Sequence, residues 1–410
     1  MSTHLDLAAA LGGWHEGLTL PQAFYVDEDV FAADLEDVYG SQWLFAGHTV
    51  DVRSPGDYFT ATVGRDSVII VRDDDGTLRA HHNVCRHRGS RLLPEGTGHV
   101  RGIVCPYHQW SYGLDGGLKR VRSMGESFCP ESWSLKAAHV EEMAGLVFVC
   151  FAEEAPSFAA ARAAIEPQLA PHGWATAAVA ARHRYVVAAN WKLLVENNRE
   201  CYHCRGGHPE FCATNYDLGV DGDDRADEAY EEVTEEGRLR WEEAGLDPRV
   251  VSFPDGQFFR VARLPLKPGC VTESLDGRQV APTMGMLPHA DVGSLRMIGL
   301  PNLWAHANVD YGMTTRLIPT GPTTTEVEVT FLVAPDAVVD VDYRVEDVEV
   351  VWRATSEQDW ALCENNQAGV SSRAYEPGPY SPSMEASVAS FTGWYLQLLR
   401  AAGRHLAVVG

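Results

Sequence analysis

The sequence predicts an α+β protein, in which a small antiparallel β domain precedes a larger domain of antiparallel sheet covered by helices. Two strand-rich stretches carry this prediction, one from about residue 45 to 150 and the other from 258 to 335. In both, short alternating or apolar runs are separated by Gly, Pro and Asp turns, as is typical of antiparallel strands. Helical patterns flank the second stretch on both sides.

The first part of the chain holds the expected small domain. Residues 1–41 are expected to form a helical N-terminal segment that packs on the larger domain, with helical spacing over 31–39. The small β domain is expected over residues 42–154, with a first strand that begins at Trp43 and a glycine-bearing hairpin, YGLDGGL, from Tyr112. Its other strand runs read TATVG, SVIIVR, LRAHHNV, GIVCPY and GLVFVCF.

The larger domain is expected over residues 155–410. A helix over 155–170 leads through a strand, ARHRYVVAA, into a helical run, NWKLLVENNRECYHC. The segment 217–247 carries 13 Asp and Glu residues against 3 Arg, and is expected to be an exposed helix or lid, or a solvated surface insertion. The strands SLRMIGL, NLWAHANV, GMTTRLIPT and TEVEVTFLV follow, before helical patterns over 341–366 and 385–407.

Composition narrows the class of protein. With 410 residues, 45% of them hydrophobic, the chain can bury a core in two or three domains. Its net charge of −24 argues against a nucleic-acid partner, because phosphate binding needs clustered Lys and Arg. An acidic surface can attract basic redox partners or cationic substrates. It can equally serve only to keep the protein soluble.

The same sequence indicates a cytoplasmic protein with no membrane contact. No signal peptide is visible, and no apolar run approaches the length of a membrane span. Nine cysteines at uneven spacing indicate reduced thiols and not a disulfide framework.

Four residues in two short clusters form the most informative motif. Cys85, His87, Cys105 and His108 give the pattern C-x-H-x17-C-x2-H, so each cluster offers one thiolate and one imidazole. That ligand set fits a [2Fe–2S] cluster of the Rieske type, in which two histidines replace two cysteines on one iron. A structural zinc site is the alternative, since Cys2His2 also suits tetrahedral zinc. Zinc fingers, however, place like ligands together, and here each cluster mixes the two types.

A second group of metal-ligand residues lies in the run NNRECYHCRGGH. His203 and His208 are five residues apart, so they converge only if the helix breaks between them. Gly206 and Gly207 sit at that place and permit such a break. Glu200, three residues before His203, would share its helix face.

A third ligand is expected from the helix over 341–366. Its inward positions are expected near Val348, Trp352, Thr355, Asp359, Leu362 and Asn366. Asp359 falls on this largely apolar stripe, where a bare carboxylate is costly to bury unless it is paired or bound to a metal. Two histidines and one carboxylate make the facial triad of non-haem Fe(II) oxygenases. Asp359 could equally be a partly exposed residue at a helix edge.

Two other interpretations of the histidine pair remain open. Cys201 and Cys204 could bind zinc together with His208, because CYHC is a C-x2-C motif. Alternatively, His203 and His208 are ordinary core or surface residues. An upstream electron relay disfavours both interpretations, because a relay needs somewhere to send electrons.

The motifs CRH…CPYHQW, NWKLLVENNRECYHCRGGHP and EQDWALCENNQAG resemble those of Rieske non-haem iron oxygenase α subunits. Within that family, ENNRECYHC is most similar to the oxygenases acting on quaternary ammonium compounds, such as glycine betaine monooxygenase and stachydrine demethylase. The resemblance implies that Cys85, His87, Cys105 and His108 hold the [2Fe–2S] cluster, and that His203, His208 and Asp359 hold one mononuclear iron.

The resemblance also implies how the two metals communicate. Glu200 would bridge His203 of one subunit and a Rieske histidine of its neighbour, expected to be His108, within an α3 homotrimer. Most family members carry Asp where this chain has Glu200, a departure shared by the quaternary-ammonium branch. Electrons would come from NAD(P)H through a separate flavin and iron–sulfur reductase, since this chain shows no convincing dinucleotide fingerprint.

The activity that follows is a monooxygenase reaction with O2, an N-demethylation of a methylated amine that releases formaldehyde. Aromatic faces recognise a quaternary ammonium through cation–π attraction. Phe259 and Trp304 are the pocket candidates, unless they are core aromatics. The alternatives are a Rieske oxygenase that hydroxylates an aromatic ring, favoured by a pocket without cation-stabilising aromatics, and a Rieske electron carrier, favoured by loss of any iron ligand.

Overall fold

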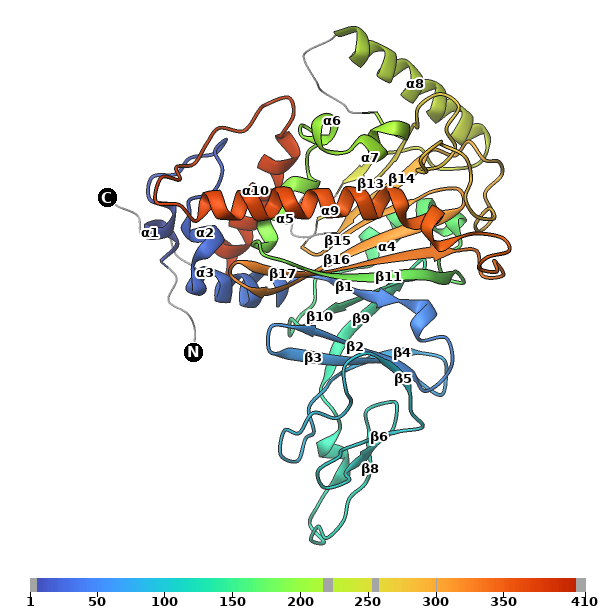
Figure 1. Cartoon of the computed structure of the whole chain (residues 1–410). Helices are drawn as coiled ribbons and strands as arrows, with labels where there is room; N and C mark the ends of the chain where they lie inside the picture. The colour runs from blue at the N-terminus through green and yellow to red at the C-terminus, as the bar shows by residue number, and fades with distance from the viewer. Residues whose placement is uncertain (1–5, 217–223, 253–257, 300, 403–410) are drawn as a thin grey trace.

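The computed structural model describes residues 6–216, 224–252, 258–299 and 301–402. Figure 1 shows two bodies along one axis: a small β domain with its loops at one end, and a larger domain of sheet and helices at the other. All strand pairs between named strands are antiparallel in the described residues. The α+β fold class is therefore confirmed.

The small domain is built on a seven-stranded sheet in the order β1-β10-β9-β4-β3-β2-β5. Its strand β3 is buried through its middle five residues, as the apolar run SVIIV predicts for a strand covered on both faces. The strands of this sheet are β1 (Leu44–His48), β2 (Asp57–Val63), β3 (Asp66–Arg72), β4 (Leu78–His82), β5 (Thr97–His99), β9 (Ala137–Met143) and β10 (Leu146–Cys150).

A three-stranded sheet, in the order β6-β7-β8, extends the small domain away from the larger one. It contains the predicted glycine hairpin, whose Gly116 has φ 80° and so needs a residue without a Cβ. Its strands are β6 (Ile103–Val104), β7 (Ser111–Tyr112) and β8 (Leu118–Arg120).

The larger domain is built on a second seven-stranded sheet, in the order β11-β17-β16-β15-β14-β13-β12. The small domain docks on it through β1, where the Asn302 side chain bonds both the N–H and the carbonyl of Phe45, at 2.9 and 3.0 Å. The strands of this sheet are β11 (Ala178–Val187), β12 (Val251–Ser252), β13 (Phe259–Leu264), β14 (Ser294–Gly299), β15 (Leu303–Ala307), β16 (Tyr311–Gly321) and β17 (Thr324–Val333).

Helices cover one face of this second sheet, with α9 running along it (Figure 1). The α-helices are α1 (Leu7–Leu11), α2 (Ala23–Val26), α3 (Glu28–Ala33), α4 (Ala159–Leu169), α5 (Trp191–Asn198), α6 (Cys204–Gly207), α7 (Pro209–Thr214), α8 (Asp224–Glu243), α9 (Val345–Val370) and α10 (Ala386–Ala401). A π-helical turn (Asp34–Tyr39) and 3-10 turns at 49–51, 130–133 and 170–172 complete the set. None of the described helices is both long and apolar enough to cross a membrane.

A buried ion pair fixes the N-terminal segment to the larger domain. Asp34 and Lys192 form it with side chains that are 0% exposed. Trp191 Nε1 also donates to Asp34, at 2.9 Å, and the Tyr395 hydroxyl donates to its other oxygen, at 2.6 Å. One carboxylate thereby joins the π-helical turn, the start of α5 and α10.

Two predicted helices differ from the sequence patterns. The run 190–204 is helical only to Asn198, because the chain turns there into the loop that carries the histidines. Helix α9 is inward at Val348, Trp352 and Thr355, but Leu362 and Asn366 are exposed, and Cys363 and Gln367 face the core instead. The predicted stripe follows a seven-residue repeat, whereas the buried face of a straight helix with 3.6 residues per turn rotates away from such a repeat.

Part of the acidic segment 217–247 lies outside the described residues, namely 217–223. Residues Asp224–Glu243 form α8 at the outer edge of the larger domain (Figure 1). Its Trp241 is fully buried against Leu246, Val292 and Val309. This end of the segment is therefore anchored in the fold by an apolar contact.

Candidate active site

The four motif residues Cys85, His87, Cys105 and His108 lie on two loops with the same backbone geometry. In each loop the cysteine N–H donates to the carbonyl five residues on, at 2.8 Å, and the cysteine carbonyl accepts from the residue four positions on, at 3.0 Å. That residue has positive φ in both loops, 76° at Gly89 and 61° at Gln109. The two loops therefore present their ligand pairs as a matched set.

The side chains of these loops converge. Cys85 and Cys105 are buried, whereas His87 is exposed and His108 partly exposed. The imidazole Nδ1 atoms of His87 and His108 face each other at 3.2 Å, and the His87 ring stacks on Trp110 at 4.8 Å between centroids. Two enclosed sulfurs and two facing imidazole nitrogens suit a [2Fe–2S] cluster of the Rieske type.

The surroundings of Cys105 favour a metal ligand, whereas burial raises the pKa of the Cys85 thiol. The Tyr112 hydroxyl lies 3.4 Å from the Cys85 sulfur. Burial acts to raise the pKa of Cys105, but hydrogen bonds from the Tyr107 amide and the Cys85 thiol outweigh it and lower the pKa. A lowered pKa favours the thiolate, which is the form that binds metals.

The second histidine pair lies where the helical run breaks. Helix α5 ends at Asn198, and the short helix α6 holds Gly206 and Gly207 between the two histidines. His208 follows with φ −128° and ψ 71°, a non-helical conformation, and Pro209 opens α7. The break that the glycines and the proline predict is therefore present, and it turns His208 back toward His203.

Both histidines point at one carboxylate oxygen of α9. His203 Nε2 lies 3.2 Å and His208 Nε2 lies 3.0 Å from Asp359 Oδ1. A metal with bonds of about 2.1 Å separates donor atoms at right angles by about 3 Å. Both distances to the carboxylate oxygen therefore suit a facial triad, and the buried His208 Nε2 and Asp359 Oδ1 have no regular hydrogen-bond partner.

The outer nitrogen of each ring is held by an acceptor. His203 Nδ1 donates to Glu200 Oε1 at 2.5 Å, and His208 Nδ1 donates to Gln358 Oε1 at 2.8 Å. Gln358 is in turn oriented by donating to Glu210 at 2.9 Å. Such acceptors fix the tautomer in which Nε2 carries no proton, as a metal ligand requires.

The electrostatics of this site favour a cation. Burial lowers the pKa of His203, but its contacts with Asp359 and Glu200 outweigh it and raise the pKa to about 9. Burial acts to raise the pKa of Asp359, but the contacts of this carboxylate with His203 and His208 outweigh burial and lower its pKa. A dication between these groups would take the place of protons as their shared positive charge.

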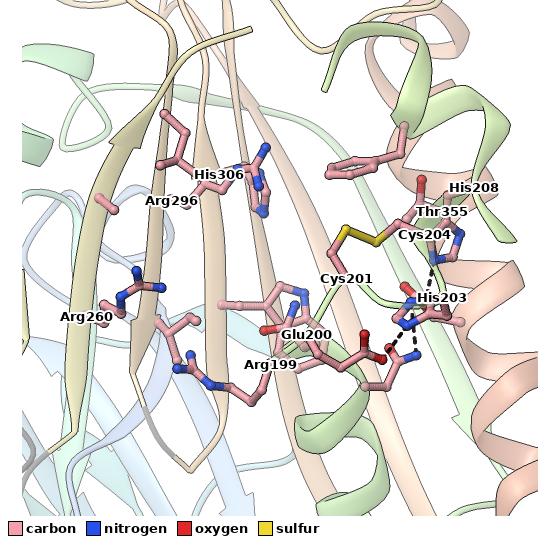
Figure 2. Close-up of a pocket in the computed structure, with 18 of the residues that line it drawn as sticks. Arg199, Glu200, Cys201, His203, Cys204, His208, Arg260, Arg296, His306 and Thr355 are labelled. Atoms are coloured by element: carbon pink, nitrogen blue, oxygen red, sulfur yellow. Dashed lines mark hydrogen bonds and ion pairs between the residues drawn. A yellow bond between two sulfur atoms is a disulfide. The ribbon is translucent and has the colours of Figure 1, made fainter. Parts of the chain in front are cut away.

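A disulfide changes the interpretation of the neighbouring cysteines. Cys201 and Cys204 are joined by a disulfide, with Cα atoms 5.0 Å apart (Figure 2). The expectation that all cysteines are reduced was therefore wrong for this pair. The Cys204 sulfur lies close to His203 and His208, but a disulfide sulfur offers no thiolate. The zinc interpretation with Cys201, Cys204 and His208 loses its ligands.

A cavity of about 690 Å³ is lined by both histidines and by Asp359. Of the two aromatic residues predicted to line it, Trp304 does so. Phe259 does not, because its ring packs against Phe148 and Phe158 in the core, with centroids 5.7 and 5.6 Å apart. The remaining aromatic rings at the cavity are Phe211, Tyr230 and Trp352.

Charged residues that sequence reasoning missed also line the cavity. They include Arg199, Arg260 and Arg296, which come from the loop after α5 and from β13 and β14. The strand pattern places alternate residues on one face but does not say which face meets a cavity. Arg199 directly precedes Glu200 in the quoted motif, and this adjacency was the one signal that could have found it.

Comparisons with known proteins agree with both sites. Residues 42–138 match the Rieske [2Fe-2S] domain family, and residues 174–401 match the family of ring hydroxylating alpha subunits, catalytic domain. The glycine betaine monooxygenase oxygenase subunit of Chromohalobacter salexigens is 42% identical over 92% of this chain and 85% of that protein. Its counterpart in Pseudomonas aeruginosa is 39% identical over 92% and 88%.

Solved structures agree on the fold. A quaternary ammonium Rieske monooxygenase, whose structure concerns carnitine oxidation and inter-subunit electron transfer, superposes with a TM-score of 0.66. It is 23% identical, and the alignment covers 96% of this chain and 98% of that one.

Proposed function

Because this chain belongs to the Rieske non-haem iron oxygenases, as an oxygenase α subunit, we propose that it N-demethylates a quaternary ammonium compound of the glycine betaine or stachydrine kind. One observation carries the proposal. The chain is 38–42% identical, over 92% of its length, to three glycine betaine monooxygenase oxygenase subunits.

The residues have distinct tasks in this reaction. Cys85, His87, Cys105 and His108 would hold the [2Fe–2S] cluster, and His203, His208 and Asp359 the mononuclear iron. When bound, the cluster relays single electrons and the iron activates O2. One oxygen atom enters an N-methyl group, which leaves as formaldehyde, and the other forms water with two electrons and two protons.

The aromatic lining of the cavity is suited to binding a cationic headgroup. The rings of Trp304, Trp352 and Tyr230 line it, and aromatic faces stabilise a methylated ammonium that has no N–H to donate. Three arginine side chains in the lining make the same cavity a poor fit for an apolar aromatic ring. The electron-carrier alternative is disfavoured by the three converging donor atoms of the proposed iron site.

Electrons would enter through a neighbouring subunit. The loops that would hold the cluster lie at the far end of the molecule from α6 and α7, which flank the histidine pair (Figure 1). Glu200 holds His203 Nδ1 from the side away from Asp359, and so can bridge to His108 of a second copy within an α3 trimer. A separate reductase, with flavin and an iron–sulfur centre, would supply electrons from NAD(P)H in the cytoplasm.

The test is a metal analysis followed by a turnover assay. After purification without oxygen, we expect about three irons and two acid-labile sulfides per chain. With a general reductase, glycine betaine or stachydrine should then yield formaldehyde. The same metals without formaldehyde from any methylated amine would leave an oxygenase with another substrate, and two irons only would remove the proposed iron site.

A further inference from the structure

We propose that Arg199 and Arg260 form an anion subsite that binds the carboxylate of the substrate, so that the enzyme prefers a zwitterionic betaine to a cation such as choline. This inference rests on the proposed function and deepens it. It assigns the end of the substrate opposite to the methylated nitrogen.

Arg199 is a buried cation that has no anionic partner among the residues that the structure describes. The residue is 6% exposed, and its Nε and Nη1 atoms are buried without a hydrogen-bond partner. Its guanidinium lies over the ring of Phe258, 5.2 Å from the centroid. Buried charged groups are normally paired, because an unpaired one is costly. A ligand anion would supply the missing acceptors.

Arg260 approaches Arg199 from the sheet. Figure 2 shows the two side chains converging on one side of the cavity, across from His203 and His208. Burial first, and then the charge of Arg260, lower the pKa of Arg199 to about 10. Two guanidinium groups that repel each other in one cavity form a natural receptor for a carboxylate.

The third arginine of the cavity shows the contrast. Arg296 donates to Asn215 at 2.5 Å and lies 3.6 Å from the buried carboxylate of Glu273. In the part of the chain that the structure describes, no carboxylate lies within ion-pair distance of Arg199 or Arg260, Glu231 of the cavity wall included. The protein therefore neutralises Arg296 itself and leaves the other two for a ligand.

The position of the subsite also bears on the reaction. Arg199 directly precedes Glu200, which holds His203, so the anion subsite and a proposed iron ligand share one short loop. A carboxylate bound at the arginines would orient the methylated ammonium within the cavity. Positioning of this kind lowers the entropic cost of the reaction.

The test separates the two ends of the ligand. We would measure binding by calorimetry to the metal-loaded enzyme with three ligands: glycine betaine, choline, which lacks the carboxylate, and 3,3-dimethylbutyrate, in which carbon replaces the charged nitrogen. The variants are R260Q, R199Q and the conservative R260K. R249Q is the matched control, because Arg249 is exposed, pairs with Asp247 and lies outside the cavity.

We expect R260Q and R199Q to weaken glycine betaine and 3,3-dimethylbutyrate by about tenfold to a hundredfold, the range for a charge-assisted hydrogen bond, and to leave choline within about twofold. R260K should keep most of the affinity, and R249Q all of it. Unchanged binding of both carboxylates in R260Q and R199Q, with cluster spectrum and iron content intact, would overturn the proposal.

An equal loss for choline would overturn it as well, since the arginines would then only support the fold. If R199Q does not fold, the binding measurements on R260Q and R260K are sufficient to test the proposal. Arg260 is less buried than Arg199, so its substitution disturbs the fold less. Should wild-type enzyme release no formaldehyde from any methylated amine and yet bind 3,3-dimethylbutyrate through these arginines, the proposed function would fail while the subsite stood.

Discussion

At the scale of single residues, the proposed iron site depends on a division of labour between the two nitrogens of each histidine. The Nδ1 atoms of His203 and His208 are held by Glu200 and Gln358, and both Nε2 atoms therefore point at Asp359. Neither ring can turn without losing its acceptor. The hydrogen bonds at the Nδ1 atoms thus position the Nε2 atoms as candidate iron ligands.

The ligand role of Asp359 predicts a selective loss of one metal. In D359A the two imidazoles keep their acceptors but lack the anionic ligand, so iron should fall from about three to about two atoms per chain. The red-brown cluster spectrum should persist, because the cluster loops lie in the other domain. The control is E357A on the exposed side of α9. Full iron in D359A would contradict the assignment.

The bridging role of Glu200 predicts a loss of electron transfer without a loss of metal. E200Q keeps an oxygen that can accept from His203 Nδ1 but removes the charge that would hold a second imidazole. We expect both metals to remain and reoxidation of the reduced cluster, followed by stopped-flow absorbance with substrate and O2, to slow by at least about tenfold. Wild-type rates in E200Q would show that electrons take another route.

At this scale, the sequence predicts candidate site residues where residue chemistry is distinctive and local. Four Cys and His residues, a His pair at a Gly-Gly break and a carboxylate on an apolar stripe were all visible in the sequence. Gln358 and Arg260 were not visible, because their roles come from what faces them across the fold. Phe259 was misplaced for the same reason: its strand was predicted, but not which face of that strand meets the cavity.

At the scale of elements, α5 sets the position of the histidine loop. Its start is held in place because Lys192 and Trp191 both bind the buried Asp34 carboxylate. Its last turn carries Glu196, which accepts a hydrogen bond from the Tyr25 hydroxyl at 2.9 Å. Periodicity predicted that a helix begins here. The partner of Lys192 lies 158 residues earlier, a separation at which the sequence pattern says nothing about pairing.

Glu196 predicts a pH-dependent stability. Burial raises the pKa of its carboxyl from 4.5 to about 7, more than the contacts with Tyr25 and Lys192 lower it. The folded state therefore binds this proton more tightly than the unfolded chain, and the resulting stability is present below pH 4.5 and lost as the pH rises through 7. At about 1.4 kcal/mol per pKa unit, the loss is of the order of 3 kcal/mol.

E196Q should escape this loss, because a glutamine can accept from Tyr25 and never ionises. We expect the unfolding free energy of E196Q relative to wild type to rise by up to about 3 kcal/mol between pH 5 and pH 8, measured by urea denaturation with tryptophan fluorescence. E357Q, an exposed change, should show no such trend. A constant difference between E196Q and wild type would mean that Glu196 ionises at its ordinary pKa.

At the scale of the whole molecule, the two proposed metal sites lie at opposite ends of one chain. The loops beside β6 and β8 point away from the larger domain, and α6 and α7 lie on its far side (Figure 1). The strand patterns predicted both domains, but the direction in which they stack is set by contacts such as that between Asn302 and Phe45. One chain alone therefore offers no short electron path from cluster to iron.

This separation predicts that two inactive variants restore each other. H108A should lack a functional cluster and H203A a functional iron site, so each alone should release no formaldehyde. In a cyclic trimer, a subunit with a cluster can serve a neighbour that has iron. When the two are co-expressed with different tags and the trimers that carry both tags are isolated, one of the three donor–acceptor pairs in each trimer is productive, and activity should recover to about a third of wild type.

Mixing the separately purified variants should give no activity, because intact trimers do not exchange subunits at once. The recovery of activity depends on whether electrons pass between chains or within one chain, and not on the chemistry at either metal site. Transfer within one chain would leave the doubly tagged trimers inactive, since no chain carries both metals, and would remove both the trimer and the Glu200 bridge from the mechanism. If H108A does not fold, a C105S chain, which also loses a cluster ligand, takes its place in the same pairing.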